Sequence, residues 1–165
     1  MAAVERNGKW ALVNDKLKLI TDFVYDDILM DDYGFCSKYE TIVARVGSEF
    51  VFLNTDGKQS SLQGFEQAAI PASKDGLIAI MNRGKWGFAD KNGNIVIQEQ
   101  YEEAKSFSLG LAPIKQGDLW GYVNTDGRLV TEMEFYEANP FSKDGAATVK
   151  SRFSWSIITL CKYDT

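Results

Sequence analysis

The chain has 165 residues and a formal net charge of −5, with no histidine and only two cysteines. The acidic balance argues against nucleic-acid binding, because phosphates are bound mainly through Lys and Arg. The lack of histidine excludes Ser-His-Asp and Cys-His catalysis and His-liganded zinc sites. A hydrophobic content of 45% suffices for one folded domain, which we expect to span residues 1–165.

The first residues, Met1 to Arg6, lack the basic and apolar regions of a secretory signal, and no stretch approaches 18 apolar residues. We therefore expect a cytoplasmic protein without a membrane partner. Cys36 and Cys161 are far apart and lie in no CxxC motif, so the sequence predicts two buried thiols and neither a disulfide framework nor a metal centre.

An aromatic residue returns along the chain in steps of 40, 36, 34 and 35 residues, and we call these positions the anchors. Fifteen residues after each of the first four anchors comes a second aromatic. This fixed offset predicts a tandem repeat whose short units must stack to bury their apolar faces. The anchors are Trp10, Phe50, Trp86, Trp120 and Trp155.

The first unit departs from the later ones in two places. Residues 14–17 read Asn-Asp-Lys-Leu and lack the glycine of the later turns, so we expect a different turn there. Residues 29–40 make this the longest unit and add aromatics and acids, which indicates either a tolerated surface insertion or a partner-binding surface. The residues of that candidate surface are Asp31, Asp32, Tyr33, Phe35 and Tyr39.

In the later units the pattern predicts two strands joined by a tight hairpin, then a turn, then a third strand. The turn reads Asn-Thr-Asp-Gly at residues 54–57 and 124–127, and Asp-Lys-Asn-Gly at 90–93. Its glycine can adopt the positive φ that closes such a turn, while the leading Asn or Asp accepts local backbone hydrogen bonds. Third strands are expected at residues 94–98 and 129–132.

The predicted fold is therefore all-β. Four three-stranded antiparallel meanders and a partial fifth would stack in a curved array that is open or incompletely closed. The fifth unit, anchored at Trp155, lacks the Asn-x-Asp-Gly turn. It indicates either a segment of a longer array or a short unit that caps the fourth, and we favour the cap.

Two phrases of the sequence resemble the WG repeat, also called the KWG repeat. They are Gly84 to Gly93, which reads Gly-Lys-Trp-Gly-Phe-Ala-Asp-Lys-Asn-Gly, and Leu119 to Gly127, which reads Leu-Trp-Gly-Tyr-Val-Asn-Thr-Asp-Gly. The glycine after the anchor is replaced by Ala11, Val51 and Ser156 in the other units. The resemblance implies an all-β repeat domain of bacterial proteins with no activity common to all members. It also implies toxin-immunity neighbourhoods as one setting.

Other motifs are better explained by structure than by chemistry. The turns at residues 90–94 and 124–127 lack the twelfth-position Glu of a calcium loop, so we expect no metal. The acid pairs at residues 26–27, 31–32 and 102–103 predict solvated connectors, because adjacent carboxylates point apart instead of facing each other across a cleft. No nucleophile, base or cofactor motif appears, so we expect neither an enzyme nor a cofactor.

The repeated aromatics favour a core role over a row of sugar-stacking platforms, with Tyr25 and Tyr101 expected to be the more exposed ones. The sequence thus predicts a non-catalytic protein-interaction domain, whose partner could be a basic protein masked in the manner of an immunity protein. A carbohydrate or cell-envelope-binding module is the alternative.

Overall fold

The computed structural model describes residues 1–36, 39–61, 63–71 and 77–160. These residues form strands, turns and irregular segments, with no helix among them. The strands, in chain order, are β1 (Ala2–Arg6), β2 (Lys9–Val13), β3 (Asp27–Ile28), β4 (Ile42–Val46), β5 (Glu49–Leu53), β6 (Gln67–Ala68), β7 (Ile78–Asn82), β8 (Lys85–Ala89), β9 (Ile95–Tyr101), β10 (Glu103–Ala104), β11 (Leu111–Gln116), β12 (Leu119–Asn124), β13 (Glu137–Ala138), β14 (Ala146–Lys150) and β15 (Trp155–Thr159).

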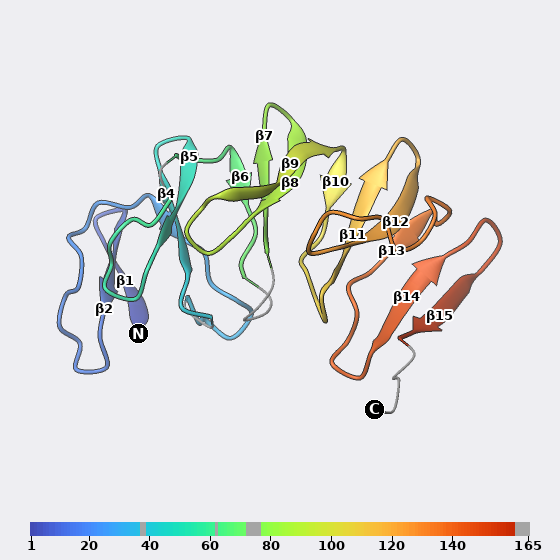
Figure 1. Ribbon diagram of the computed structural model, residues 1–165. Coiled ribbons are helices and arrows are strands. Elements are labelled where there is room, and N and C mark those ends of the chain that lie inside the picture. Colours follow the sequence, from blue (N-terminus) through green and yellow to red (C-terminus); the bar gives the residue numbers. More distant parts are fainter. Residues whose placement is uncertain (37–38, 62, 72–76, 161–165) are drawn as a thin grey trace.

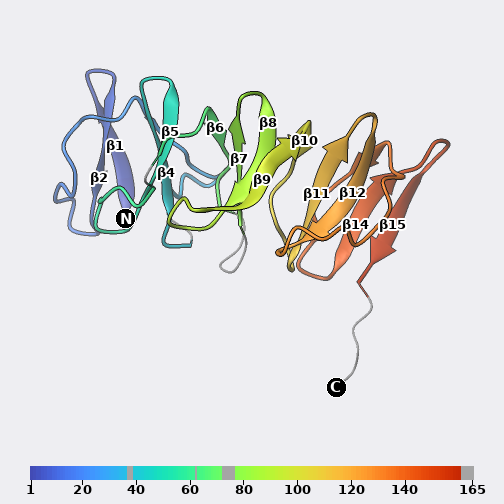
Figure 2. The same cartoon turned by 45° about the horizontal axis from the view of Figure 1, so that its top comes forward.

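Within the described residues, the strands form five small antiparallel sheets in succession: β1-β2, β3-β4-β5, β6-β7-β8-β9, β10-β11-β12 and β13-β14-β15. Figure 1 shows these sheets side by side in a curved row, and Figure 2 shows the same order in a second view. The first and last sheets lie at opposite ends of the row, so the array is open. The predicted all-β repeat fold is confirmed.

Each sheet after the first joins the connector of one unit to the hairpin of the next. In the second sheet, Asp27 of β3 pairs with Arg45 of β4, and Ile28 pairs with Ala44. The same antiparallel pairing joins β6 to β7, β10 to β11 and β13 to β14. Consecutive units are therefore tied by backbone hydrogen bonds, and each connector covers the edge of the hairpin that follows it.

The third strand of the meander is continuous in the third unit but not in the fourth. There β9 pairs with β8, with Phe88 opposite Ile97. In the fourth unit, Leu129 makes only an isolated bridge to Val123, so the strand predicted at residues 129–132 is wrong.

A hydroxyl group explains this difference. Thr131 Oγ1 accepts the Tyr122 N–H at 3.1 Å, and Thr21 Oγ1 accepts the Leu12 N–H at 3.0 Å in the first unit. Ser61 plays the same role in the second unit, whereas the third unit has Ile97 at this place, eleven residues after its anchor. A side-chain oxygen thus replaces one bond of the backbone ladder wherever the strand is interrupted.

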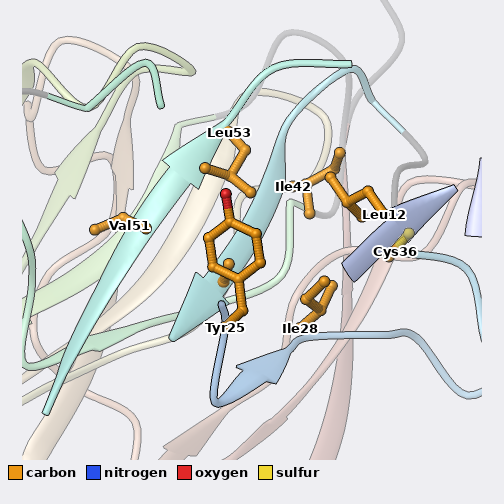
Figure 3. Close-up of a cluster of buried hydrophobic side chains, with 8 residues drawn as sticks. Leu12, Tyr25, Ile28, Cys36, Ile42, Val51 and Leu53 are labelled. Carbon is orange, nitrogen blue, oxygen red and sulfur yellow. The ribbon is translucent and has the colours of Figure 1, made fainter. Parts of the chain in front are cut away.

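The hydrophobic core is divided into clusters that straddle neighbouring units. Figure 3 shows one of them, in which side chains from β2, β3, β4 and β5 point toward one another around Tyr25. Cys36 belongs to this cluster with 3% of its surface exposed, while Cys161 lies outside the described residues. Because each cluster draws on two units, a single unit cannot bury its own apolar face.

The anchor aromatics differ in how much of their surface is buried. Trp120 is buried, and Trp10, Phe50 and Trp86 are partly buried, whereas Trp155 is 53% exposed. Of the second aromatics, Tyr25, Phe65 and Tyr101 are buried and Phe135 is partly buried. Tyr25 forms a bridge with Trp10, and Tyr101 pairs with Trp86.

Tyr25 and Tyr101 are only 8% and 7% exposed, so the expectation that they are the more exposed aromatics is wrong. Burial raises the pKa of both phenols. The fifth hairpin exposes three large apolar side chains, Phe153, Trp155 and Ile157. On its inner side, Ala147 and Val149 lie in a buried cluster with Trp120 and Tyr122 of the fourth unit.

The turn of the first unit has the same geometry as the later turns, so the expectation of a different turn is wrong. Asn14 Oδ1 accepts two backbone N–H groups at 3.0 Å, and Asn54 Oδ1 does the same in the second unit. Leu17 adopts a φ of 57° where Gly57 has 74°. The sequence thus places a leucine in the left-handed region that glycine usually occupies.

The later glycines are required by packing as well as by φ. A Cβ at Gly57 would lie 2.5 Å from Thr21 Cγ2 of the first unit, and a Cβ at Gly93 would lie 2.5 Å from Ser61 Cβ of the second. Each turn therefore rests on the preceding unit. Leu17, at the equivalent position of the first unit, is 77% exposed.

Candidate binding surface

The predicted partner-binding residues Asp31, Asp32, Tyr33 and Phe35 lie in a projecting turn between β3 and β4, which we call the aromatic turn (residues 31–35). Tyr33 is 83% exposed and Phe35 is 59% exposed, and Asp32 is also exposed. Two large rings thus reach solvent close together in sequence. The next residue, Cys36, points into the core and anchors the turn.

The side chain of Asp31 holds the aromatic turn in shape and is not a freely projecting acid. Its Oδ1 accepts the N–H groups of Tyr33 at 3.0 Å and Phe35 at 2.9 Å. Its own N–H donates to the Phe35 carbonyl, and the Gly34 N–H donates to the Asp31 carbonyl. These bonds fix the backbone under both rings before any partner arrives, which lowers the entropy lost on binding.

The fifth predicted residue, Tyr39, is partly buried and lies outside the aromatic turn. Residues 37–38, which the prediction for residues 29–40 also included, lie outside the described residues.

The same turn occurs in the fourth unit without aromatic residues. Residues 142–146 read Ser-Lys-Asp-Gly-Ala, the Ala146 N–H donates to Ser142 Oγ at 3.3 Å, and Gly145 has the φ of 81° seen at Gly34. The array therefore repeats one backbone turn and varies its side chains. Such unit-specific side chains on a shared scaffold are the usual means by which repeat proteins select partners.

In two connectors, one acid of the pair bonds to the unit that follows. Lys9 Nζ lies 2.7 Å from Asp26 Oδ1, and the Gly47 N–H of the next hairpin donates to Asp26 Oδ2 at 2.7 Å. The bond from Lys9, followed by that from Gly47, holds the pKa of Asp26 below its usual value. We call this arrangement a charge clamp: a lysine before the anchor, an acid after the second aromatic, and a turn glycine of the next unit.

A second charge clamp joins the third and fourth units. Lys85 Nζ lies 2.9 Å from Glu102 Oε1, and the Gly117 N–H donates to Glu102 Oε2 at 3.2 Å. The Lys85 hydrogen bond is the main reason why the pKa of Glu102 is lowered. Neighbouring Glu103 pairs with Lys115 at 2.7 Å. Among the described residues, no group of three or more Cys, Asp or Glu is placed to hold a metal ion.

The joint between the second and third units lacks the lysine of the charge clamp and contains a groove instead. The position before the anchor Phe50 is Glu49, and Glu66 accepts the Gly84 N–H at 3.3 Å as the clamp acids do. The groove, with a volume of about 1060 Å³, lies at this joint. Sequence reasoning missed it, although Glu at a position that is Lys in two other units was a readable signal.

These features define an open, β-rich repeat domain of the class of repeat-type binding modules. The family model described as WG containing repeat matches residues 86–120 and 120–152, which are two adjacent repeats and less than half of the chain. Two adjacent units of the chain are accordingly WG repeats, as the resemblance indicated.

No curated protein sequence matches the chain. Among solved structures, it is similar to Kluyveromyces lactis Hsv2 complete loop 6CD, with 13% sequence identity and a TM-score of 0.46. That alignment covers 76% of this chain and 43% of the other, so the chain spans less than half of that protein's length. The described residues include no helix with the length and apolar character needed to cross a membrane.

Proposed function

We propose that this WG-repeat array is a non-catalytic module that binds a partner protein through the aromatic turn. The observation that supports the proposal is the exposure of Tyr33 and Phe35 on a turn whose backbone is already fixed by Asp31. Exposed aromatics of this kind supply much of the binding free energy in protein interfaces. Because the turn is held in shape, little of that free energy is lost in ordering it.

The charge of the module favours a basic partner. The chain carries a formal net charge of −5, and Asp32 lies in the aromatic turn itself. A basic protein would be steered toward this surface at low ionic strength. In the narrower form of the proposal, the module masks an active surface of its partner in the manner of an immunity protein.

The experiment is an affinity capture from the lysate of the source organism, followed by identification of the partner and a binding measurement with both proteins purified. The test variant is Tyr33→Ser/Phe35→Ser, which keeps Asp31 and therefore the turn. Phe153→Ser/Tyr136→Ser is the matched control, because these two aromatics are 90% and 50% exposed elsewhere on the array.

We expect the test variant to bind the partner with an affinity lower by about a hundredfold or more, while the affinity of the control stays within about threefold of that of the intact chain. Added salt should slow association with a basic partner. Equal affinity of the test variant and the intact chain would remove the aromatic turn from the proposal. Failure to capture a specific protein would count against the module as a protein binder.

A glycan-binding module is the second candidate, and one observation favours it: Trp155 is an anchor aromatic that is 53% exposed, with Lys150 Nζ 5.8 Å from its ring centre. An exposed indole can stack on a sugar ring. Glycan-array binding that is lost in Trp155→Ser, and kept in Tyr33→Ser/Phe35→Ser, would support this candidate over the first.

A further inference from the structure

The groove between the second and third units is formed by polar side chains over a small apolar floor. It is bounded by the start of β5, the segment before β6, the turn between β7 and β8, and β9, which Figure 1 shows as neighbours in the middle of the array. The apolar floor consists of Val46, Val51 and Ile95. The polar lining consists of Glu49, Gln59, Gln63, Gly64, Glu66, Asn82, Arg83, Lys85, Gln98 and Glu99.

The repeat itself shows what is missing at this joint. At the two flanking joints that contain a charge clamp, the residue before the anchor is Lys9 or Lys85, and it neutralises the acid that receives the next unit's turn. Here the corresponding residue is Glu49, which packs against Gly64 so closely that a Cβ on Gly64 would overlap its carboxylate. The acid of this joint, Glu66, keeps its bond to the Gly84 N–H. The joint therefore holds two carboxylates where its neighbours hold a carboxylate and a lysine.

The other charged groups of the lining do not replace that lysine. Lys85 is paired with Glu102 of the next charge clamp. Glu99 accepts the Asn82 amide at 2.8 Å and adds a third carboxylate. With Lys85 neutralised by its own partner, the described residues of the lining provide three carboxylates and one further cation, Arg83, so this lining carries an excess of negative charge. Neighbouring like charges favour the entry of a cation that offsets them.

We infer that the groove is a binding site for a lysine or arginine side chain presented by an extended basic segment of a partner protein. The cation would occupy the place of the missing clamp lysine, between Glu49 and Glu66. Its aliphatic stem would lie on Val51 and Ile95, as long basic side chains commonly do on apolar surface. The amides of the glutamine side chains can accept hydrogen bonds from the segment's backbone.

A sugar ring fits this lining less well than a basic side chain. The described residues of the groove include no aromatic ring on which a sugar could stack. The groove and the aromatic turn lie in different connectors. A result that excludes binding at one of them therefore leaves binding at the other untested.

The test uses the intact chain and a short Gly-Ser peptide containing two lysines, with a twin peptide in which norleucine replaces both. Binding is followed by chemical-shift changes of backbone amides in two-dimensional NMR spectra. We expect the lysine peptide, at up to millimolar concentration, to shift the amides of Gly64 and Gly84. The norleucine twin should leave them unchanged.

The decisive variant is Glu49→Lys, which supplies the cation from within the chain. It should lower the affinity for the lysine peptide at least tenfold, and Glu49→Gln should lower that affinity by a smaller factor. Asp126→Lys makes the same change of charge in an exposed turn of the fourth unit. Its affinity for the lysine peptide should stay within twofold of that of the intact chain. The dispersion of each spectrum verifies that the variant is folded.

Three results would overturn the inference. They are no shift at Gly64 and Gly84, equal shifts with the norleucine peptide, or equal binding by Glu49→Lys and the intact chain. If the lysine peptide binds as weakly to Asp126→Lys as to Glu49→Lys, its attraction is to the net charge of the chain and not to the groove.

Discussion

The first and third units carry the same turn, but only one of the turns is covered. Leu17 and Gly93 occupy equivalent positions, and both adopt positive φ, 57° and 79° respectively. Gly93 lies against Ser61 of the preceding unit, whereas Leu17 extends into solvent. The comparison teaches that glycine in this turn meets two separate requirements, a positive φ and close contact with the neighbouring unit. Where the second requirement is missing, a larger residue such as leucine is tolerated.

The largest expected effect comes from adding a side chain to a covered turn. Gly93→Ala would place its Cβ 2.5 Å from Ser61 Cβ and 2.8 Å from Ser61 Cα, so the second and third units must move apart. We expect the free energy of unfolding to fall by about 3 kcal/mol, the sum of left-handed strain and overpacking. Urea denaturation measures the change.

Gly8→Ala separates the two contributions. Gly8 also has positive φ, 77°, but a Cβ there meets nothing within 4 Å. It should cost only the strain of about 1 kcal/mol. Equal losses in the two variants would show that contact with the preceding unit adds nothing to the requirement for glycine.

A second effect concerns the segment after the turn, where the first unit has Thr21 and the third has Ile97. Thr21→Val keeps the shape of the side chain but removes the acceptor of the buried Leu12 N–H, now bonded at 3.0 Å. We expect a loss of about 1–3 kcal/mol, the cost of leaving a buried donor unpaired. The measurement is again urea denaturation, with Thr55→Val in an exposed turn as the control. A loss no greater than that of the control would mean that the hydroxyl does not replace a bond of the ladder.

A smaller effect of opposite sign is expected for Leu17→Gly. The change removes the strain of a leucine with a φ of 57°, and it gives up little burial because Leu17 is 77% exposed. The greater freedom of glycine in the unfolded chain offsets part of the gain, so we expect stabilisation by about 0.5–1 kcal/mol. Thermal or urea unfolding that shows a loss would indicate a contact of Leu17 that outweighs its strain.

The spacing of the anchors was enough to predict the class of fold. Glycine and Asn at fixed offsets from an aromatic specify turns, and the turns separate strands of fixed length, so an all-β repeat follows from local rules. The aromatic turn could also be located, because Tyr33 and Phe35 have no counterparts in the fourth unit. What the local rules cannot supply is the neighbour of each residue.

The wrong predictions all concern such neighbours. Tyr25 is polar enough to suggest exposure, but it is buried in a cluster that combines Leu12 of its own unit with Leu53 of the next. The strand predicted at residues 129–132 has suitable residues, yet the Thr131 hydroxyl competes for the Tyr122 N–H. Leu17 keeps the turn without glycine, and its side chain is 77% exposed. In each case a contact formed by stacking, or its absence, overrides the local preference.

The smallest expected effect tests the joint between the second and third units against its neighbours. Glu49→Lys would give this joint the lysine that Lys9 and Lys85 provide elsewhere, with Glu66 as its partner. An exposed ion pair stabilises by about 0.2–1 kcal/mol, so the free energy of unfolding should rise by that amount at low salt and less at high salt. Glu66→Gln in the same background removes the partner and should cancel the gain, as a double-mutant cycle would show. If Glu49→Lys stabilises equally with and without Glu66, the gain comes from the lower net charge alone, and the three joints do not share one arrangement.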